Sequence, residues 1–119
     1  MQYKRADRVA VLIKEEISKI LLKDAKDPQI GFVTITKVKL SSDLKHAKIY
    51  YSVLGDEQKK EQAGEALNRL TSFMRSEIAH RVRLRFVPTI QFFFDDSLEY
   101  ADRINKIINK LHDEDNIKS

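Results

Sequence analysis

The sequence predicts an α+β domain with the element order helix, strand, strand, helix, helix, strand, helix. Two periodicities lead to this prediction: apolar residues recur every three or four positions in some segments, as on amphipathic helices, and every second position in others, as on strands. A helical segment separates the second and third strands, so these two should run parallel through a right-handed crossover. We expect a three-stranded mixed sheet with helices packed on one face.

The first helix is predicted from a stripe of apolar side chains at three- and four-residue steps: Val9, Leu12, Ile13, Ile17, Ile20 and Leu21. Pro28 lacks an amide hydrogen and disfavours helical geometry at the preceding residue, so the helix should end between residues 23 and 27. A strand is predicted over residues 32–40. Its apolar residues change phase in the middle, which a β-bulge near Thr36 and Lys37 would reconcile.

The second strand alternates apolar and polar side chains over residues 47–53 and follows the turn residues 41–43, so it should form an antiparallel hairpin with the first. A long helical pattern then runs from Asp56, a candidate N-cap, to Val82. Thr71 and Ser72 lie in its middle, and both hydroxyls can bond to backbone carbonyls and bend a helix. Two helices should therefore meet there.

Residues 90–94 alternate as the third strand, and Asp96 with Glu99 matches a capping box at the start of the last helix. We expect this helix to face inward with a stripe made of Leu98, Ala101, Ile104, Ile107, Ile108 and Leu111. The chain should then form one domain over residues 1–112 with a flexible tail over residues 113–119.

Composition narrows the class of protein. The chain has 119 residues, 42% of them hydrophobic and 34% charged, which is typical of one globular domain. No apolar run approaches the roughly 20 residues of a membrane span, and residues 1–7 do not resemble an export signal. The absence of cysteine excludes disulfides and thiolate metal sites. We expect a cytoplasmic protein.

Motifs for catalysis, metal binding or cofactor binding do not emerge. The three glycines have neither the Walker spacing nor the dinucleotide-binding spacing. The three histidines lie on separate predicted elements, which favours surface or RNA-facing roles over metal ligation. Asp95 and Asp96 are adjacent at a strand end, so helix capping is the better interpretation of this carboxylate pair. We expect no metal, no cofactor and no enzyme activity.

Positive charge concentrates between residues 67 and 94, where five arginines face a single acid, Glu77, giving a local net charge of +4. Guanidinium groups bind phosphate in a bidentate manner, so nucleic acid is the first hypothesis for a partner. Residues 95–119 carry seven acids and four bases, net −3. The alternatives are a protein-interaction module whose basic face meets an acidic partner protein, and an ordinary solvated surface.

Aromatic residues offer a second possible RNA site. If Ile49, Tyr51 and Val53 face the helices, a different set lies on the opposite face of the sheet: Thr34, Lys48, Tyr50 and Phe93. That face could stack bases, as several RNA-binding modules do. The alternative is that Phe93 is partly covered and Tyr50 simply tolerates solvent.

Several segments together are similar to one family. They are Lys-Asp-Pro-Gln-Ile-Gly-Phe-Val-Thr-Ile-Thr at residues 26–36, Ser-Ser-Asp-Leu at 41–44, Ala-Lys-Ile-Tyr at 47–50, Leu-Arg at 84–85 and Asp-Asp-Ser at 95–97. In order and over nearly the whole chain, they resemble bacterial ribosome-binding factor A. The resemblance implies a KH-like domain of the second type.

The resemblance also implies a function. Members of that family bind the immature small ribosomal subunit late in assembly, promote processing of its rRNA, matter most for growth in the cold, and are monomeric assembly factors with a GTPase assembly factor as a functional neighbour. The family carries an Ala-x-Gly kink between two helices, where this chain has Leu70, Thr71 and Ser72. Without glycine the junction should bend less, or bend through its hydroxyls.

The predicted partners are therefore small-subunit rRNA and the free small subunit. Phosphate contacts should position the protein, while folded rRNA shape supplies specificity. We predict that five arginines lie against rRNA phosphates: Arg69, Arg75, Arg81, Arg83 and Arg85. Five further residues should assist them: Arg5, Arg8, Lys45, His46 and Lys48.

Overall fold

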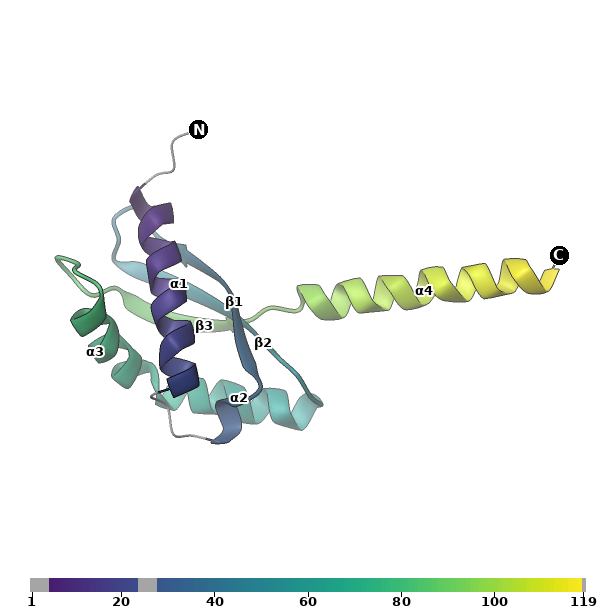
Figure 1. The fold of residues 1–119 in the computed structure, drawn as a ribbon, viewed down its shortest axis with the longest axis horizontal. Coiled ribbons are helices and arrows are strands. Elements are labelled where there is room, and N and C mark those ends of the chain that lie inside the picture. Colours follow the sequence, from purple (N-terminus) through teal and green to yellow (C-terminus); the bar gives the residue numbers. More distant parts are fainter. Residues whose placement is uncertain (1–4, 24–27, 119) are drawn as a thin grey trace.

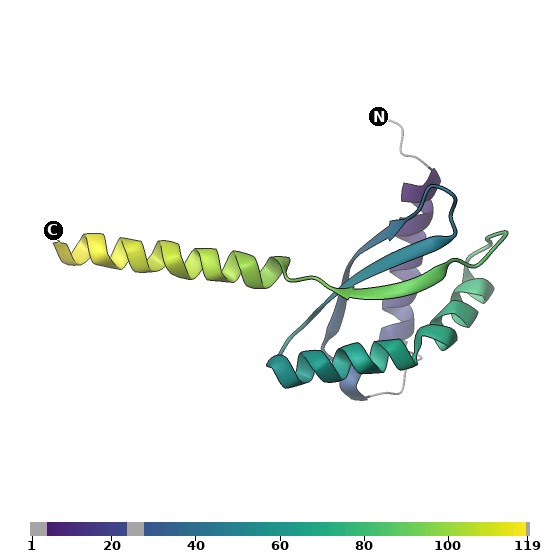
Figure 2. The same ribbon diagram turned by 180° about the vertical axis from the view of Figure 1, so that it is seen from behind.

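The computed structural model describes residues 5–23 and 28–118, shown from two sides in Figures 1 and 2. Its elements are α1 (Arg5–Lys23), the short 3-10 helix η1 (Pro28–Ile30), β1 (Val33–Leu40), β2 (His46–Val53), α2 (Glu57–Arg69), α3 (Thr71–Arg81), β3 (Thr89–Phe94) and α4 (Ser97–Lys118). The predicted order of helices and strands is confirmed. The predicted end of the first helix falls partly on residues 24–27, outside the described part of the chain.

The three strands form one mixed sheet in the order β1-β2-β3. β1 and β2 are antiparallel, and β2 and β3 are parallel. The register between β1 and β2 shifts between Ile35 and Lys37, which confirms the predicted bulge. α1, α2 and α3 pack on one face of this sheet, and Figure 2 shows the opposite face, where the strands lie in front of α1.

The core lies between that sheet face and the three helices. Fully buried side chains come from α1 (Ile13, Ile17, Ile20), β2 (Ile49), α2 (Leu67) and α3 (Met74, Ile78). Each such side chain contributes about 1.5–3 kcal/mol relative to an exposed one. Leu12 is an exception to the predicted stripe, because it is 49% exposed. The residues that reach the sheet follow a narrower line along α1 than the apolar pattern suggested.

The long helical pattern breaks at Leu70, which separates α2 from α3. Leu70 has φ −89° and ψ 0°, a conformation open to any L-residue, so the break requires no glycine. The Thr71 hydroxyl donates a hydrogen bond to the Leu67 carbonyl at 3.1 Å. The prediction of two helices meeting here is confirmed, and one of the two hydroxyls is used as expected. At the other end of α2, the Asp56 carboxylate accepts from the Lys59 amide at 2.9 Å, as predicted for an N-cap.

The prediction that the last helix packs inward is wrong. α4 projects away from the sheet in Figures 1 and 2. The apolar residues whose side chains are described are exposed, including Ile107 at 55% and Leu111 at 56%. An amphipathic stripe shows that a helix has an apolar side, but the helices α1 to α3 already cover the packed sheet face.

α4 also continues past His112 to Lys118, so it is longer than expected. The division into a domain of residues 1–112 and a flexible tail of residues 113–119 stays a prediction. Among the helices of the described ranges, none combines the length and the apolar character needed to cross a bilayer.

Candidate nucleic-acid interface

Three of the predicted contact residues come together at one end of the molecule. Arg5 at the start of α1, Lys45 between β1 and β2, and Arg85 between α3 and β3 line the same hollow, which has a volume of about 240 Å³. Phe86 lines it too, and its ring is 65% exposed. Segments far apart in the sequence thus present three cations and an aromatic ring to the same volume.

The loop that carries Lys45 is held by its own side chains. The Ser41 hydroxyl donates to Asp43 Oδ1 at 2.6 Å, the Lys45 amide donates to the same oxygen at 3.0 Å, and the His46 amide donates to Ser41 Oγ at 3.0 Å. The bonds to Asp43, that from Ser41 first, lower its pKa below the ordinary value of 3.8. The predicted turn chemistry is confirmed. Asp43 lines the same hollow as Lys45, and its ionised carboxylate offsets part of the positive charge there.

The loop that carries Arg83 and Arg85 is neither helix nor strand. Arg75 on α3 anchors its far end: Nε donates to the Pro88 carbonyl at 3.1 Å and Nη2 to the Val87 carbonyl at 3.3 Å. Arg83 and Arg85 are both exposed, and the Arg85 guanidinium lies 5.6 Å from the centre of the Phe86 ring. Arg75 therefore positions the loop, while Arg83 and Arg85 face solvent.

Arg81, the last residue of α3, forms ion pairs within the protein. Its Nε lies 3.3 Å from a Glu77 oxygen and its Nη1 lies 3.6 Å from a Glu16 oxygen on α1. The pair with Glu16 joins α3 to α1. A phosphate at Arg81 would compete with two carboxylates, so RNA binding there would cost the free energy of these ion pairs. The described contacts of Arg85 include no such ion pair.

Arg69 lies far from the Arg5 end. It ends α2 beside the Leu70 break, and its Nη2 donates to Gln29 Oε1 at 3.0 Å. Gln29 lies in η1, which follows α1, whereas Arg5 begins α1, a helix of 19 residues that is roughly 30 Å long at about 1.5 Å per residue. The structure therefore does not bring the helix junction and the Arg5 hollow into one compact cluster.

The remaining predicted residues lie on α1 and β2. Arg8 is exposed one turn along α1 from Arg5, on the same side of the helix. His46 begins β2, and its Nδ1 is hydrogen-bonded with Thr89 Oγ1 at 2.8 Å. Lys48 lies on the uncovered sheet face, with Nζ 6.0 Å from the centre of the Phe93 ring.

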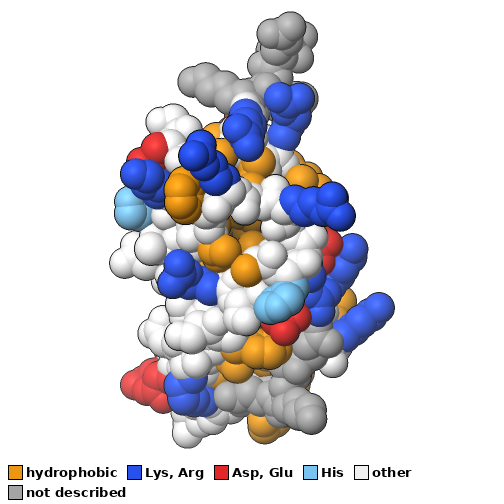
Figure 3. Space-filling view, turned by 90° about the vertical axis from the view of Figure 1, so that its left-hand side faces the viewer, with side chains coloured by type: hydrophobic (Ala, Val, Ile, Leu, Met, Phe, Trp, Pro, Cys, Tyr) orange, Lys and Arg blue, Asp and Glu red, His pale blue; other side chains and the backbone are white. Residues whose placement is uncertain are grey.

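Figure 3 views the molecule from the end that carries α3. Lys and Arg side chains are spread over this surface, Asp and Glu side chains are fewer, and apolar side chains lie between them. We call the group formed by Arg5, Arg8, Lys45, Arg83 and Arg85 the basic end. Such a surface attracts a polyanion, because the electrostatic potentials of neighbouring like charges add up and extend about one Debye length into the solvent.

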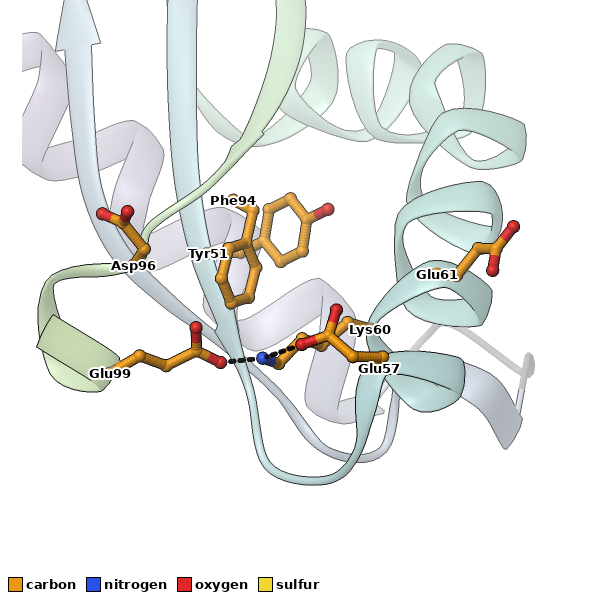
Figure 4. Close-up of a pocket in the computed structure, with 7 residues that line it drawn as sticks. All are labelled: Tyr51, Glu57, Lys60, Glu61, Phe94, Asp96 and Glu99. Atoms are coloured by element: carbon orange, nitrogen blue, oxygen red, sulfur yellow. Dashed lines mark hydrogen bonds and ion pairs between the residues drawn. The ribbon is translucent and has the colours of Figure 1, made fainter. Parts of the chain in front are cut away.

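A larger hollow, of about 490 Å³, lies between α2 and the start of α4 and is acidic. Figure 4 shows Lys60 between Glu57 and Glu99, with both of which it forms ion pairs, while Glu61 and Asp96 point elsewhere. We expected Glu99 to form a capping box with Asp96, and in the structure its carboxylate forms an ion pair with Lys60. Acidic walls repel phosphate, so this hollow is a poor RNA site. No cluster of three metal-ligating side chains occurs within the described residues.

Sequence reasoning missed three residues at these surfaces: Phe86, Lys37 and Lys39. Phe86 follows Arg85 and could have been noticed as an aromatic neighbour of a candidate contact. Lys37 belongs to the predicted bulge and Lys39 follows it, and the register places them opposite Tyr50 and Lys48 on the uncovered sheet face. Following the bulge through to its end would have found both.

Comparisons with known proteins agree on one family. The sequence model of the family described as "Ribosome-binding factor A" matches residues 5–108. The ribosome-binding factor A of Halothermothrix orenii is 44% identical over 115 residues, covering 97% of this chain and 94% of that protein. The crystal structure of ribosome-binding factor A from Thermus thermophilus superposes with a TM-score of 0.67 at 25% identity, covering 75% of this chain and 93% of that one.

A second Thermus thermophilus structure comes from the study of a complex. It is a homology model of ribosome-binding factor A fitted into a cryo-EM map of a 30S complex, and it superposes with a TM-score of 0.65 at 24% identity. It covers 76% of this chain and 96% of that one. At this identity the match is evidence for the fold, which agrees with the mixed sheet and helix order described above.

Proposed function

The chain belongs to the ribosome-binding factor A family, and on that premise we propose that it binds the immature small ribosomal subunit through rRNA and assists late maturation. The observation that supports this most directly is the convergence of Arg5, Lys45 and Arg85 around one hollow. Cations held on three different elements fit a folded phosphate backbone, because their spacing is set by the fold.

The proposal includes the finer roles that the resemblance implies. The protein acts in the cytoplasm as a monomer, promotes rRNA processing and growth in the cold without cleaving RNA itself, and works beside a GTPase assembly factor. Support for an indirect role in processing comes from Asp95, the best carboxylate candidate for chemistry. It accepts hydrogen bonds from the Thr36 hydroxyl at 2.7 Å and the Ser97 amide at 3.0 Å, as a structural residue does.

A charge-removal variant tests the basic end. Arg5, Lys45 and Arg85 are replaced together by alanine, and binding to purified free small subunits is measured by co-sedimentation over a salt series. Each lost phosphate contact should lower the slope of log affinity against log salt by roughly 0.7–0.9. The triple variant should therefore bind more weakly at low salt and show a slope lower by about two to three.

The matched control removes three positive charges from α4 through Arg103→Ala, Lys106→Ala and Lys110→Ala. These residues are exposed on the helix that projects away from the basic end. The control should keep the wild-type salt slope. Equal losses in both variants would mean that only net charge matters, and an unchanged slope in the first variant would contradict the proposed interface. If the basic end bound a ribosomal protein instead of RNA, the chain would still bind the proteins of the small subunit after the rRNA is removed.

A further inference from the structure

One face of the sheet is covered by none of the helices in residues 5–23 and 28–118, and it carries an organised set of aromatic and basic side chains. The register places Tyr50 opposite Phe93 on one side and opposite Lys37 on the other. In the next row, Lys48 lies opposite Lys39 and Gln91. We call Lys37, Lys39, Lys48, Tyr50 and Phe93 the sheet platform.

The two rings of the sheet platform are neighbours. Their centroids are 5.7 Å apart and their planes are tilted by 30° relative to each other. Phe93 is 38% exposed and Tyr50 is partly exposed. The apolar residues on the other side of the same strands, Ile49 and Ile90, are in the core. Packing of the core therefore holds the two rings at a fixed place on the surface.

Three ammonium groups surround these rings. Lys37 Nζ lies 4.6 Å and Lys39 Nζ 6.0 Å from the Tyr50 ring centre, and Lys48 Nζ lies 6.0 Å from the Phe93 ring centre. Each of these lysines is exposed. A face with two adjacent rings and three cations complements a ligand with flat aromatic groups joined by negative charges, which is the chemistry of unpaired nucleotides.

We propose that the sheet platform binds an unpaired stretch of RNA by stacking bases on Tyr50 and Phe93 while Lys37, Lys39 and Lys48 contact its phosphates. This inference rests on the proposed function, since the RNA would be part of the small subunit. It adds a site separate from the basic end. The basic end binds phosphate charge of any RNA, whereas the sheet platform requires bases that are free of a partner strand.

The relative strengths of the contacts favour a bound state in which bases replace the lysine ammonium groups that lie over the rings. A cation–π contact at an exposed site is weaker than the stacking of one base on an aromatic side chain. A base can therefore replace an ammonium over a ring, and the freed ammonium gains a phosphate. The flexible lysine stem allows this movement without any change in the strands.

The test uses the full chain and a fluorescently labelled ten-nucleotide oligouridylate, with an RNA duplex of the same length as a second probe. The variant Tyr50→Leu with Phe93→Leu keeps apolar side chains on the strands and removes the rings. It should bind oligouridylate at least about fivefold more weakly, the effect of losing one stacked base. Its salt slope should be unchanged because no charge is lost, and its duplex binding should match the wild type.

Two further variants separate stacking from misfolding. Lys37→Ala with Lys39→Ala leaves the core intact and should lower the oligouridylate salt slope by about 0.7 for each lost contact. The control Phe32→Leu removes a different exposed ring, which also has a lysine over it, Lys59 Nζ at 4.7 Å. This control should bind both probes as the wild type does, and thermal unfolding monitors the fold of every variant.

Three outcomes would overturn the inference: no oligouridylate binding by the wild type, wild-type oligouridylate binding by the ring variant, or an equal loss in the Phe32→Leu control. A ring variant that loses the small subunit but keeps oligouridylate would assign this face to a ribosomal protein instead and would also overturn it. Co-sedimentation of the wild type with small subunits tests the proposed function separately, so a failure of this inference can be told apart from a failure of the proposed function.

Discussion

At the scale of single residues, hydrogen bonds decide which charged groups are available to a partner. Asp95 is an example among the acids. The Thr36 hydroxyl, followed by the side chain and amide of Ser97, lowers the pKa of Asp95 from 3.8 to about 2. Arg75 is an example among the bases, because it donates to two backbone carbonyls. Both residues use their polar groups in contacts within the fold.

Asp95 gives a pH-dependent prediction. A carboxylate whose pKa is lower in the folded than in the unfolded state stabilises the fold above about pH 4, and this stabilisation is lost as the pH falls toward 2. Asp95→Asn removes the titrating group, so its free energy of unfolding should depend less on pH between about 5 and 2 than that of the wild type. Urea unfolding at several pH values measures this. Asp96→Asn serves as the control, and an identical pH dependence of Asp95→Asn and the wild type would contradict the prediction.

At the scale of elements, the segment between α3 and β3 connects the core to the basic end. Pro88 is buried, while Arg83, Arg85 and Phe86 are exposed only a few residues earlier. Arg75 holds the junction between these two parts through its bonds to Val87 and Pro88. The position of Arg85 beside Lys45 therefore depends on a residue that itself points toward the protein.

Arg75→Lys tests this anchoring. Lysine keeps the charge, but a single ammonium on a flexible stem cannot reproduce the fixed fork that reaches two consecutive carbonyls. We expect a loss of about 1 kcal/mol in stability and faster amide hydrogen exchange over residues 83–87. Arg83→Lys, in the same loop, is the matched control and should exchange as the wild type does. If Arg75→Lys also exchanged at the wild-type rate, Arg75 would not be the anchor.

At the scale of the whole molecule, charge and shape are both uneven. Residues 95–119 carry a net −3, so the rest of the chain carries +7 to give the total of +4. α4, which contains most of those acids, extends away from the basic end, and the molecule measures 65 × 40 × 19 Å. We expect such a dipolar molecule to approach a polyanion with the basic end first and α4 pointing away.

Deletion of residues 97–119 tests the position of α4. Its main described contact with the body is the ion pair between Glu99 and Lys60, so removal should cost about 1 kcal/mol or less. Had its isoleucines packed on the core, each would have contributed about 1.5–3 kcal/mol. Thermal and urea unfolding of the deletion are compared with Glu99→Gln in the full chain. A deletion that costs several kcal/mol more than Glu99→Gln would show that α4 packs against the body.

The sequence was sufficient for the order of elements, the bulge near Thr36 and Lys37, the hairpin, the N-cap at Asp56 and the break beside Thr71. Each depends on residues close together in the chain, where periodicity and backbone chemistry act directly. The family could also be identified from the residues, and the comparisons confirm it.

Only the tertiary structure decided which charges gather and which are used internally. Arg5, Lys45 and Arg85 meet because strand register and a helical crossover bring distant segments to one end of the sheet. Arg81 pairs with Glu16 on another helix, although its sequence context resembles that of the exposed Arg85. Ile107 and Leu111 of α4 face solvent, although their spacing resembles that of the buried residues of α1. The contacts of a side chain depend on which residues lie near it in space. Most of those residues are distant in the sequence, so the local sequence pattern does not identify them.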